Sequence, residues 1–374
     1  MGPEVARQVR AVFQQAMERE AVQFTEEIMR QLQFVLVAVF VLFTASAWAQ
    51  NGAPLKLIHT IQVPGLHAGD FGHFTIDLPS HRLFATAEDN GKVEIIDTHT
   101  NKLLHTIAGL KSPHNLLFRD DLDKLFVVDG DASEIKVYNG TTYRLVEHIP
   151  MTIDADSIAY DPVTKYLYVV SGGRAAHTPY SFIEIVDTTT SKKVGKIKID
   201  TNRIQALALE KSGPYIYCNL TGENAVGEVN HVKRSLVATW SIASKGQQAV
   251  PLAYDEADHR LFVVTRTPAK LIVLNSQSGK IITALPCVGF ADDAVYDARH
   301  KRIYIAGSGA VSVFQQQDPD HYTLIANVPG SYPLPRQKDI AKTAFLVPEL
   351  NRYYLAVPRH GTHEAEVQVY EVLP

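Results

Sequence analysis

The chain has 374 residues, with 36 Lys and Arg against 40 Asp and Glu, so its formal net charge is −4. Hydrophobic residues make up 46% and charged residues 20%, which provides for a buried core and excludes a globally disordered chain. The near-neutral charge gives no footprint for non-specific nucleic-acid binding. Two cysteines, Cys218 and Cys287, are too few for a disulfide framework, a cysteine-rich zinc site or an iron–sulfur cluster, and no Cys-x-x-Cys-His motif attaches a haem.

The N-terminal region has the pattern of an export signal. Ten uninterrupted apolar residues, 34–43, are too few for a membrane span of about 20 residues but suit the core of a secretory signal peptide. An Ala-Trp-Ala sequence ending at Ala49 fits the small-x-small cleavage pattern. The sequence therefore predicts a signal peptide at 29–49 and a mature chain, 50–374, that is periplasmic or secreted and has no transmembrane domain.

The segment before the apolar run is longer and more acidic than a signal peptide needs. A start at Met29 removes this difficulty, because it leaves a short leader in which Arg30 supplies the positive charge. Residues 1–28 are then a dispensable extension or the result of a mis-assigned start. The alternative is a true cytoplasmic segment followed by an uncleaved anchor.

Beyond the leader, one unit of strands recurs at intervals of 42 to 50 residues. Its first mark is a pair of apolar residues, which begins at Leu83, Leu125, Leu167, Ile216, Leu261, Ile303 and Tyr353. Its second mark is a strand of alternating apolar and polar residues, found at 93–97, 135–139, 183–187, 226–230, 271–275, 311–315 and 367–371. Such alternation indicates half-buried antiparallel strands.

Two further strands flank these marks in each unit. A short apolar strand precedes the first mark, as at 157–161 and 251–255, and a fourth strand follows the second mark, as at 103–107 and 236–242. Four short strands in a unit of about 40 to 50 residues are typical of a β-propeller blade. The sequence thus predicts an all-β, seven-bladed β-propeller with four-stranded antiparallel blades.

The last unit ends before its fourth strand. The segment LIHTI at 57–61 nearly repeats LLHTI at 103–107, which is an outer strand. We therefore expect the N-terminal strand of the mature chain to complete the last blade. This arrangement closes the ring and covers strand edges that would otherwise promote aggregation.

The repeated unit also resembles a known family. The pattern D-x-x-x-[HK]-R-L-[FY]-V followed by V-x-V-[IVL]-D is clearest at 73–98 and 251–264. On this pattern, 54–374 resembles the YVTN/YncE-like β-propeller repeats of exported bacterial proteins, and 290–329 with 345–358 is similar to an exported YncE-like subgroup of unassigned function. The resemblance implies the propeller fold and raises single-stranded nucleic-acid binding. It supplies no motif with a known catalytic role.

The inner strands of a propeller line a central channel, and their starts share one rim. Aligning the seven predicted inner strands places two layers of residues there. The first layer is Gly72, His114, Asp156, Gln205, Val250, Asp292 and Lys342. The second layer is His73, Asn115, Ser157, Ala206, Pro251, Asp293 and Thr343. One of the two should point into the channel mouth, and either would make that mouth polar.

Loops between the second and third strands should reach the same rim. They add Glu88, Asp89, Asn90, Asp129, Asp131, Arg174, His177, Glu223, Arg266, His360 and His363. Residues 172–180 lengthen one of these loops, which carries Arg174 and His177. Longer loops more often carry function, so this loop is the strongest single candidate.

These positions provide the candidate site residues. The ligand-binding candidates are His73, His114, Asn115, Asp156, Gln205, Asp292, Asp293, Arg174 and His177. A divalent metal could use His73, His114, Asp156, Asp292 and Asp293, since imidazole and carboxylate suit such ions, although no fixed ligand spacing supports a metal site. Polar strand ends that bind only ordered water are the simpler interpretation.

Three functions remain open. The favoured one is an exported, monomeric, non-catalytic propeller that binds a protein, a cell-envelope component or a small polar ligand at the channel rim. The second is a metal-dependent enzyme of the lactonase or lyase type, with His73 and His114 as general acid and base. The third is single-stranded nucleic-acid binding, against which the net charge argues.

Absent motifs narrow the choice further. No Gly-x-Ser-x-Gly nucleophile elbow is present, and neither a Gly-x-Gly-x-x-Gly nor a P-loop motif indicates a nucleotide cofactor. Cys218 and Cys287 could pair in an exported chain, but two free thiols are the simpler expectation.

Overall fold

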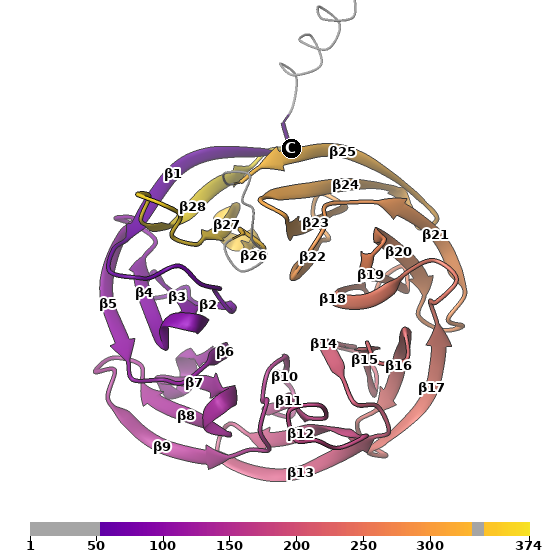
Figure 1. Cartoon of the computed structure of the whole chain (residues 1–374), viewed down its shortest axis with the longest axis horizontal. Coiled ribbons are helices and arrows are strands. Elements are labelled where there is room, and N and C mark those ends of the chain that lie inside the picture. Colours follow the sequence, from indigo (N-terminus) through magenta and orange to yellow (C-terminus); the bar gives the residue numbers. More distant parts are fainter. Residues whose placement is uncertain (1–52, 331–339) are drawn as a thin grey trace, which may run out of the picture. The chain divides into compact units, whose positions relative to one another are not determined.

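The computed structural model describes residues 53–330 and 340–374, so the predicted signal peptide and residues 1–28 lie outside the described residues. In the compact unit Pro54–Pro374, the strands form seven four-stranded antiparallel sheets arranged as a ring (Figure 1). The predicted all-β, seven-bladed β-propeller is confirmed. In the parts of the chain that the structure describes, no helix is both long and apolar enough to cross a membrane.

Each blade contains four strands in order from the channel to the perimeter. The inner strands are β2 (Phe74–Asp77), β6 (Pro113–Arg119), β10 (Ile158–Asp161), β14 (Ile204–Leu209), β18 (Gln247–Asp255), β22 (Asp293–Asp297) and β26 (Thr343–Val347). The second strands are β3 (Arg82–Ala87), β7 (Lys124–Asp129), β11 (Tyr166–Gly172), β15 (Tyr215–Leu220), β19 (Arg260–Thr267), β23 (Arg302–Gly307) and β27 (Arg352–Val357).

The remaining strands complete the blades, which we number 1 to 7 from β2 to β26. The third strands are β4 (Lys92–Asp97), β8 (Glu134–Asn139), β12 (Ser181–Asp187), β16 (Ala225–Asn230), β20 (Ala269–Asn275), β24 (Ala310–Asp318) and β28 (Ala365–Val372). The outer strands are β5 (Lys102–Ala108), β9 (Leu145–Pro150), β13 (Lys192–Ile199), β17 (Ser235–Ser241), β21 (Ile281–Pro286), β25 (His321–Pro329) and, for blade 7, β1 (Leu55–Val63).

Strand β1 closes the ring. It pairs antiparallel with β28, from Leu55 opposite Val372 to Val63 opposite Ala365, and lies beside β28 at the perimeter (Figure 1). Its Ile61 is buried in a cluster that also contains side chains of blade 1. The prediction that the N-terminal strand completes the last blade is therefore confirmed.

The core lies between the blades. Seven apolar clusters each join two neighbouring blades. Aromatic rings bridge these spaces: Tyr304 and Tyr353 have centroids 5.4 Å apart, and Phe84 stacks on Phe118 at 5.2 Å. Neither face of a blade can be buried without its neighbours, so the stability of the ring depends on its closure.

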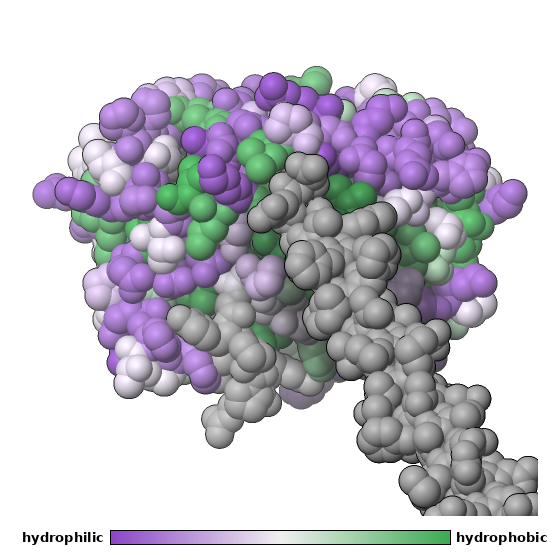
Figure 2. Space-filling model, turned by 90° about the horizontal axis from the view of Figure 1, so that it is seen from above, coloured by the Kyte–Doolittle hydropathy of each residue, from purple (hydrophilic) through white to green (hydrophobic). Residues whose placement is uncertain are grey.

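A regularity that the sequence analysis missed appears at the perimeter. Every outer strand contains a β-bulge whose unpaired residue is aliphatic; these residues are Ile58, Leu104, Val146, Val194, Val237, Ile282 and Ile325. A bulge adds local twist to a strand. From the side, apolar residues appear as patches interspersed among hydrophilic ones (Figure 2).

The two cysteines lie in different interblade spaces. Cys218 is buried in the cluster between blades 3 and 4, whereas Cys287 is half-buried against the cluster between blades 5 and 6. Both thiols are free. A disulfide between them would have to cross the core of blades 4 and 5, which explains why the two remain separate.

Candidate functional site

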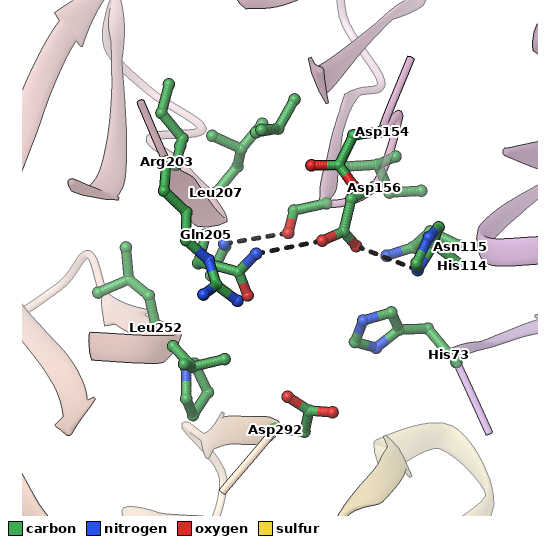
Figure 3. Close-up of a pocket in the computed structure, with 18 of the residues that line it drawn as sticks. His73, His114, Asn115, Asp154, Asp156, Arg203, Gln205, Leu207, Leu252 and Asp292 are labelled. Atoms are coloured by element: carbon green, nitrogen blue, oxygen red, sulfur yellow. Dashed lines mark hydrogen bonds and ion pairs between the residues drawn. The ribbon is translucent and has the colours of Figure 1, made fainter. Parts of the chain in front are cut away.

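The central channel opens into a cavity of about 530 Å³ that is lined mainly by polar side chains (Figure 3). All seven residues of the first predicted layer line it: Gly72, His114, Asp156, Gln205, Val250, Asp292 and Lys342. Six residues of the second layer do so as well: His73, Asn115, Ser157, Ala206, Pro251 and Asp293. Thr343, the seventh, is buried and donates its hydroxyl to the Phe71 carbonyl.

The prediction that only one layer reaches the channel mouth is therefore wrong. Successive residues of a regular strand point to opposite faces. Three inner strands break this rule at the rim, because their pairing shifts between Pro113 and Asn115, between Gln205 and Leu207, and between Ala249 and Leu252. Such irregularities turn neighbouring side chains toward the same space.

The rim loops contribute fewer residues than predicted. Glu88, Arg174 and Arg266 line the cavity. His177 lies in the same loop as Arg174 but is exposed to solvent and is not part of the cavity wall.

Other lining residues were missed by the sequence analysis. Asp70, Asp154 and Arg203 each lie two residues before the first predicted layer, and Asn202 precedes Arg203. A step of two residues along an extended chain returns a side chain to the same face. Extending the same alignment by two positions would therefore have found all three.

His73 forms an ion pair that joins blade 1 to blade 6. Its Nδ1 lies 3.2 Å from Oδ1 of Asp293 (the imidazole is labelled in Figure 3). Burial alone would lower the pKa of His73, but Asp293, assisted by the charges of Asp156 and Asp292, raises it to about 9. His73 is consequently an imidazolium at neutral pH.

His114 is charged for a similar reason. Its Nδ1 lies 3.4 Å from Oε2 of Glu88 and 3.9 Å from Oδ1 of Asp156. Burial opposes the charge, but the hydrogen bond to Glu88 and the charge of Asp156 raise the pKa of His114 to about 10. Asp156 in turn accepts a hydrogen bond of 3.2 Å from Nε2 of Gln205, which continues the network to blade 4.

The charged state of these histidines bears on the metal hypothesis. A metal ligand must be neutral imidazole, so His73 and His114 would have to lose a proton before either could bind an ion. Across the described ranges 53–330 and 340–374, no group of three or more His, Cys, Asp or Glu side chains is arranged to hold a metal ion. The five predicted metal candidates share one cavity. His73 is paired with Asp293, but Asp292 is paired with Arg266 and Lys342, and the nearest charged partner of His114 is Glu88.

Next to the His73–Asp293 pair, a chain of ion pairs links blades 5, 6, 7 and 1. Arg266 Nη2 lies 2.7 Å from Oδ1 of Asp292, and Lys342 Nζ lies 3.0 Å from both Asp292 Oδ2 and Asp70 Oδ2. Burial raises the pKa of Asp292, but Lys342 and Arg266 outweigh it and lower the pKa overall. Burial dominates at Asp70 and raises its pKa to about 6.

Three arginines from consecutive blades form a third part of the wall. Arg174, Arg203 and Arg266 belong to blades 3, 4 and 5. Burial lowers the pKa of Arg203, and the like charges of Arg174 and Arg266 lower it further. Arg266 is paired with Asp292, but within the described residues the guanidinium groups of Arg174 and Arg203 make no ion pair or hydrogen bond. In the described residues these two guanidinium groups therefore have no direct partner, although the nearby charges of Asp154 and Asp156 act on Arg203.

Comparisons with known proteins bear on the fold. No known protein family and no curated protein matches this sequence. Among solved structures, the chain is similar to hydrazine synthase of Kuenenia stuttgartiensis, with a TM-score of 0.64 over 79% of this chain and 96% of that chain, at 15% sequence identity. Similarity at this level of identity supports the propeller fold and carries no information about activity.

Proposed function

We propose that this protein is an exported β-propeller whose channel mouth binds a small polar ligand without catalysing a reaction. The observation that carries the proposal is the guanidinium of Arg203, which lines the cavity without an ion-pair partner in the described part of the chain. The other cations of the wall that we have described, except Arg174, are matched to carboxylates. A half-buried charge left unmatched among matched ones is typical of a site that a ligand completes.

The charge of the two histidines supports binding over catalysis. A general base works best when its pKa lies near the operating pH. His73 and His114 have pKa values of about 9 and about 10, so at neutral pH both are donors of hydrogen bonds. Each is also held by a carboxylate, which fixes the direction in which it donates.

An enzyme remains the second candidate because of one geometric feature. The contact between His73 Nδ1 and Asp293 fixes the ring and leaves Nε2 able to donate a proton to a bound substrate. A lactonase- or lyase-type reaction with His73 as general acid would lose its rate in His73→Gln while ligand affinity changed little. Turnover that survives this substitution would exclude that role.

The third candidate, binding of single-stranded nucleic acid, receives less support. The cavity wall contains six carboxylate side chains: Asp70, Glu88, Asp154, Asp156, Asp292 and Asp293. The cations of the same wall are, apart from Arg174 and Arg203, already paired with these carboxylates, so few remain for the phosphate backbone that supplies most of the affinity in such complexes. Membership of the YncE-like family stays part of the proposal, on the residues quoted above.

Ligand binding at the mouth is expected to disappear when the mouth is filled. Ligands are first selected from a library of small polar molecules as compounds that raise the melting temperature of the full-chain protein. Gln205→Trp places a large side chain in the cavity, so calorimetry should show that these compounds bind the variant at least tenfold more weakly than the unmodified protein. Gln277→Trp makes the same change on an exposed turn of blade 5 and should leave affinity unchanged. The proposal fails if no compound binds, or if Gln205→Trp binds as well as the unmodified protein.

Export makes a separate prediction about the N-terminus. When the full chain is produced in a Gram-negative bacterium, the protein recovered from the periplasm should begin at Gln50, because the Ala-Trp-Ala sequence fits the specificity of signal peptidase. Intact-mass measurement and N-terminal sequencing check this. Protein that retains residues 29–49 and stays with the membrane would show an uncleaved anchor instead.

A further inference from the structure

The unmatched arginines of the cavity indicate the charge of the ligand. A guanidinium presents a planar fork of N–H donors, and a carboxylate fits this fork with two parallel hydrogen bonds. Arg203 lines the cavity from blade 4 with the like charges of Arg174 and Arg266 beside it. An anion bound at Arg203 would relieve this repulsion.

Nearby carboxylates limit that anion to a single charge. The charges of Asp154 and Asp156 act on Arg203 and favour its protonated form. They would repel a ligand anion in the same place, and a doubly charged phosphate would meet about twice the repulsion of a carboxylate. A monocarboxylate is therefore the anion that the surroundings of Arg203 tolerate best.

A small apolar strip lies beside the arginines. Leu207 of blade 4 and Val250, Pro251 and Leu252 of blade 5 line the cavity next to Arg203 (Leu207 and Leu252 are labelled in Figure 3). An ion alone would gain nothing from such a surface. A carbon skeleton attached to the carboxylate would bury C–H groups against it.

The rest of the wall offers hydrogen-bond donors and acceptors. Because His73 engages Asp293 through Nδ1, its Nε2–H is available to donate. The carboxylate oxygens of Asp292 and Asp156 already accept hydrogen bonds and have remaining lone pairs. Hydroxyl groups both donate and accept hydrogen bonds, so they match this wall. Charged ligand groups match it less well, because the charged side chains of the wall are already paired with one another.

From these three surfaces we propose that the ligand is a small hydroxylated monocarboxylate of the sugar-acid type. Its carboxylate would lie on Arg203, its C–H face on the strip at Leu207 and Leu252, and its hydroxyl groups toward His73 and Asp292. The inference rests on the proposed ligand-binding function and names the chemical class that the same cavity would take.

Three probes separate the contributions in calorimetry on the full-chain protein. Glucuronate carries both the carboxylate and the hydroxyl groups, glucose carries hydroxyl groups without the carboxylate, and acetate carries the carboxylate alone. We expect glucuronate to bind at least tenfold more tightly than either of the other two. Its affinity should fall as ionic strength rises, because an ion pair is screened by salt.

Substitution of Arg203 provides the decisive comparison. Arg203→Gln should weaken glucuronate binding at least tenfold and leave glucose unchanged, whereas Arg144→Gln removes the same charge from an exposed position outside the cavity and should have no effect. Arg203→Lys keeps the charge without the planar fork, so it should give an intermediate loss. It also serves as the test if Arg203→Gln does not fold.

The possible failures are distinguishable. Equal affinity for glucuronate and glucose, or unchanged binding in the Arg203 variants, would overturn the carboxylate assignment. If glucuronate does not bind but other polar compounds bind and are blocked by Gln205→Trp, the ligand class is wrong and channel-mouth binding stands. If nothing binds, both proposals fail.

Discussion

Raising the pH from 6 to 9 is expected to lower the free energy of unfolding by on the order of 3 kcal/mol through deprotonation of His73. Deprotonation of His114 should cause a comparable loss that extends to pH 10. The folded-state pKa values, about 9 and about 10, lie above the ordinary value of 6.5. The folded protein therefore holds these protons more tightly than the unfolded chain. Their contribution to stability is complete below pH 6.5 and is lost as the pH rises through the folded-state pKa values.

Urea denaturation at a series of pH values measures this loss. His73→Gln should be less stable than the unmodified protein at pH 6 and should show a flatter decline toward pH 9. His59→Gln changes an exposed histidine of β1 and should leave the slope as it is. A stability that does not change between pH 6 and pH 9 would contradict the ion pairs with Asp293 and Glu88.

Asp70 adds to the same trend at lower pH. Burial raises its pKa to about 6 despite the partly compensating charge of Lys342. A carboxyl group with a raised pKa binds its proton more tightly in the folded state, so the associated stability is present below pH 3.8 and is lost as the pH rises through 6. Asp70→Asn should remove this part of the pH dependence of stability. The contribution of Asp70 can be distinguished from that of the two histidines because the Asp70 contribution is lost at lower pH.

Ring closure by β1 is expected to have an effect of similar size. Ile61 is 2% exposed and packs between blades 7 and 1, so Ile61→Ala should lower the free energy of unfolding by about 2–5 kcal/mol. Ile58 lies three residues earlier in the same strand at the bulge and is 39% exposed. Ile58→Ala should change stability by less than about 0.5 kcal/mol.

Thermal and urea denaturation of both variants check the closure. Because each blade depends on its neighbours, loss at this one interface should weaken the whole ring in a single transition. Equal effects of Ile58→Ala and Ile61→Ala would show that β1 does not pack as the last strand of blade 7.

Much of the fold follows from local sequence patterns. The alternation in segments such as 93–97 and 135–139 identified them as antiparallel strands, because successive side chains of a strand point to opposite faces. The similarity of 57–61 to 103–107 identified the closing strand for the same reason, since equivalent outer strands bury equivalent residues. The sequence analysis missed the aliphatic bulge residues, such as Ile58 and Leu104. A bulge residue has no partner on the neighbouring strand, and the alternation of apolar and polar residues does not reveal which residue is unpaired.

The candidate site was predicted in part. Counting along the inner strands placed His114, Asp156 and Gln205 at the channel mouth, because the alignment of repeats fixes equivalent positions. It wrongly limited the mouth to one layer, since bulges such as that between Gln205 and Leu207 depend on the pairing of whole strands. It also included His177, although the residues that this loop brings to the cavity are Gly172, Arg174 and Ala175.

The seven blades, their strand order and the polar character of the channel mouth follow from residue patterns along the chain. Which charges meet at the mouth depends on the folded ring: Asp293 of blade 6 lies against His73 of blade 1, and Arg203 has no ion-pair partner in the described residues. The two differ because burial of a strand is a local property, whereas the pairing of charges is not. Strand patterns reflect burial within a few neighbouring residues, whereas the charge of a histidine depends on burial and on carboxylates from distant blades that approach only when the ring closes.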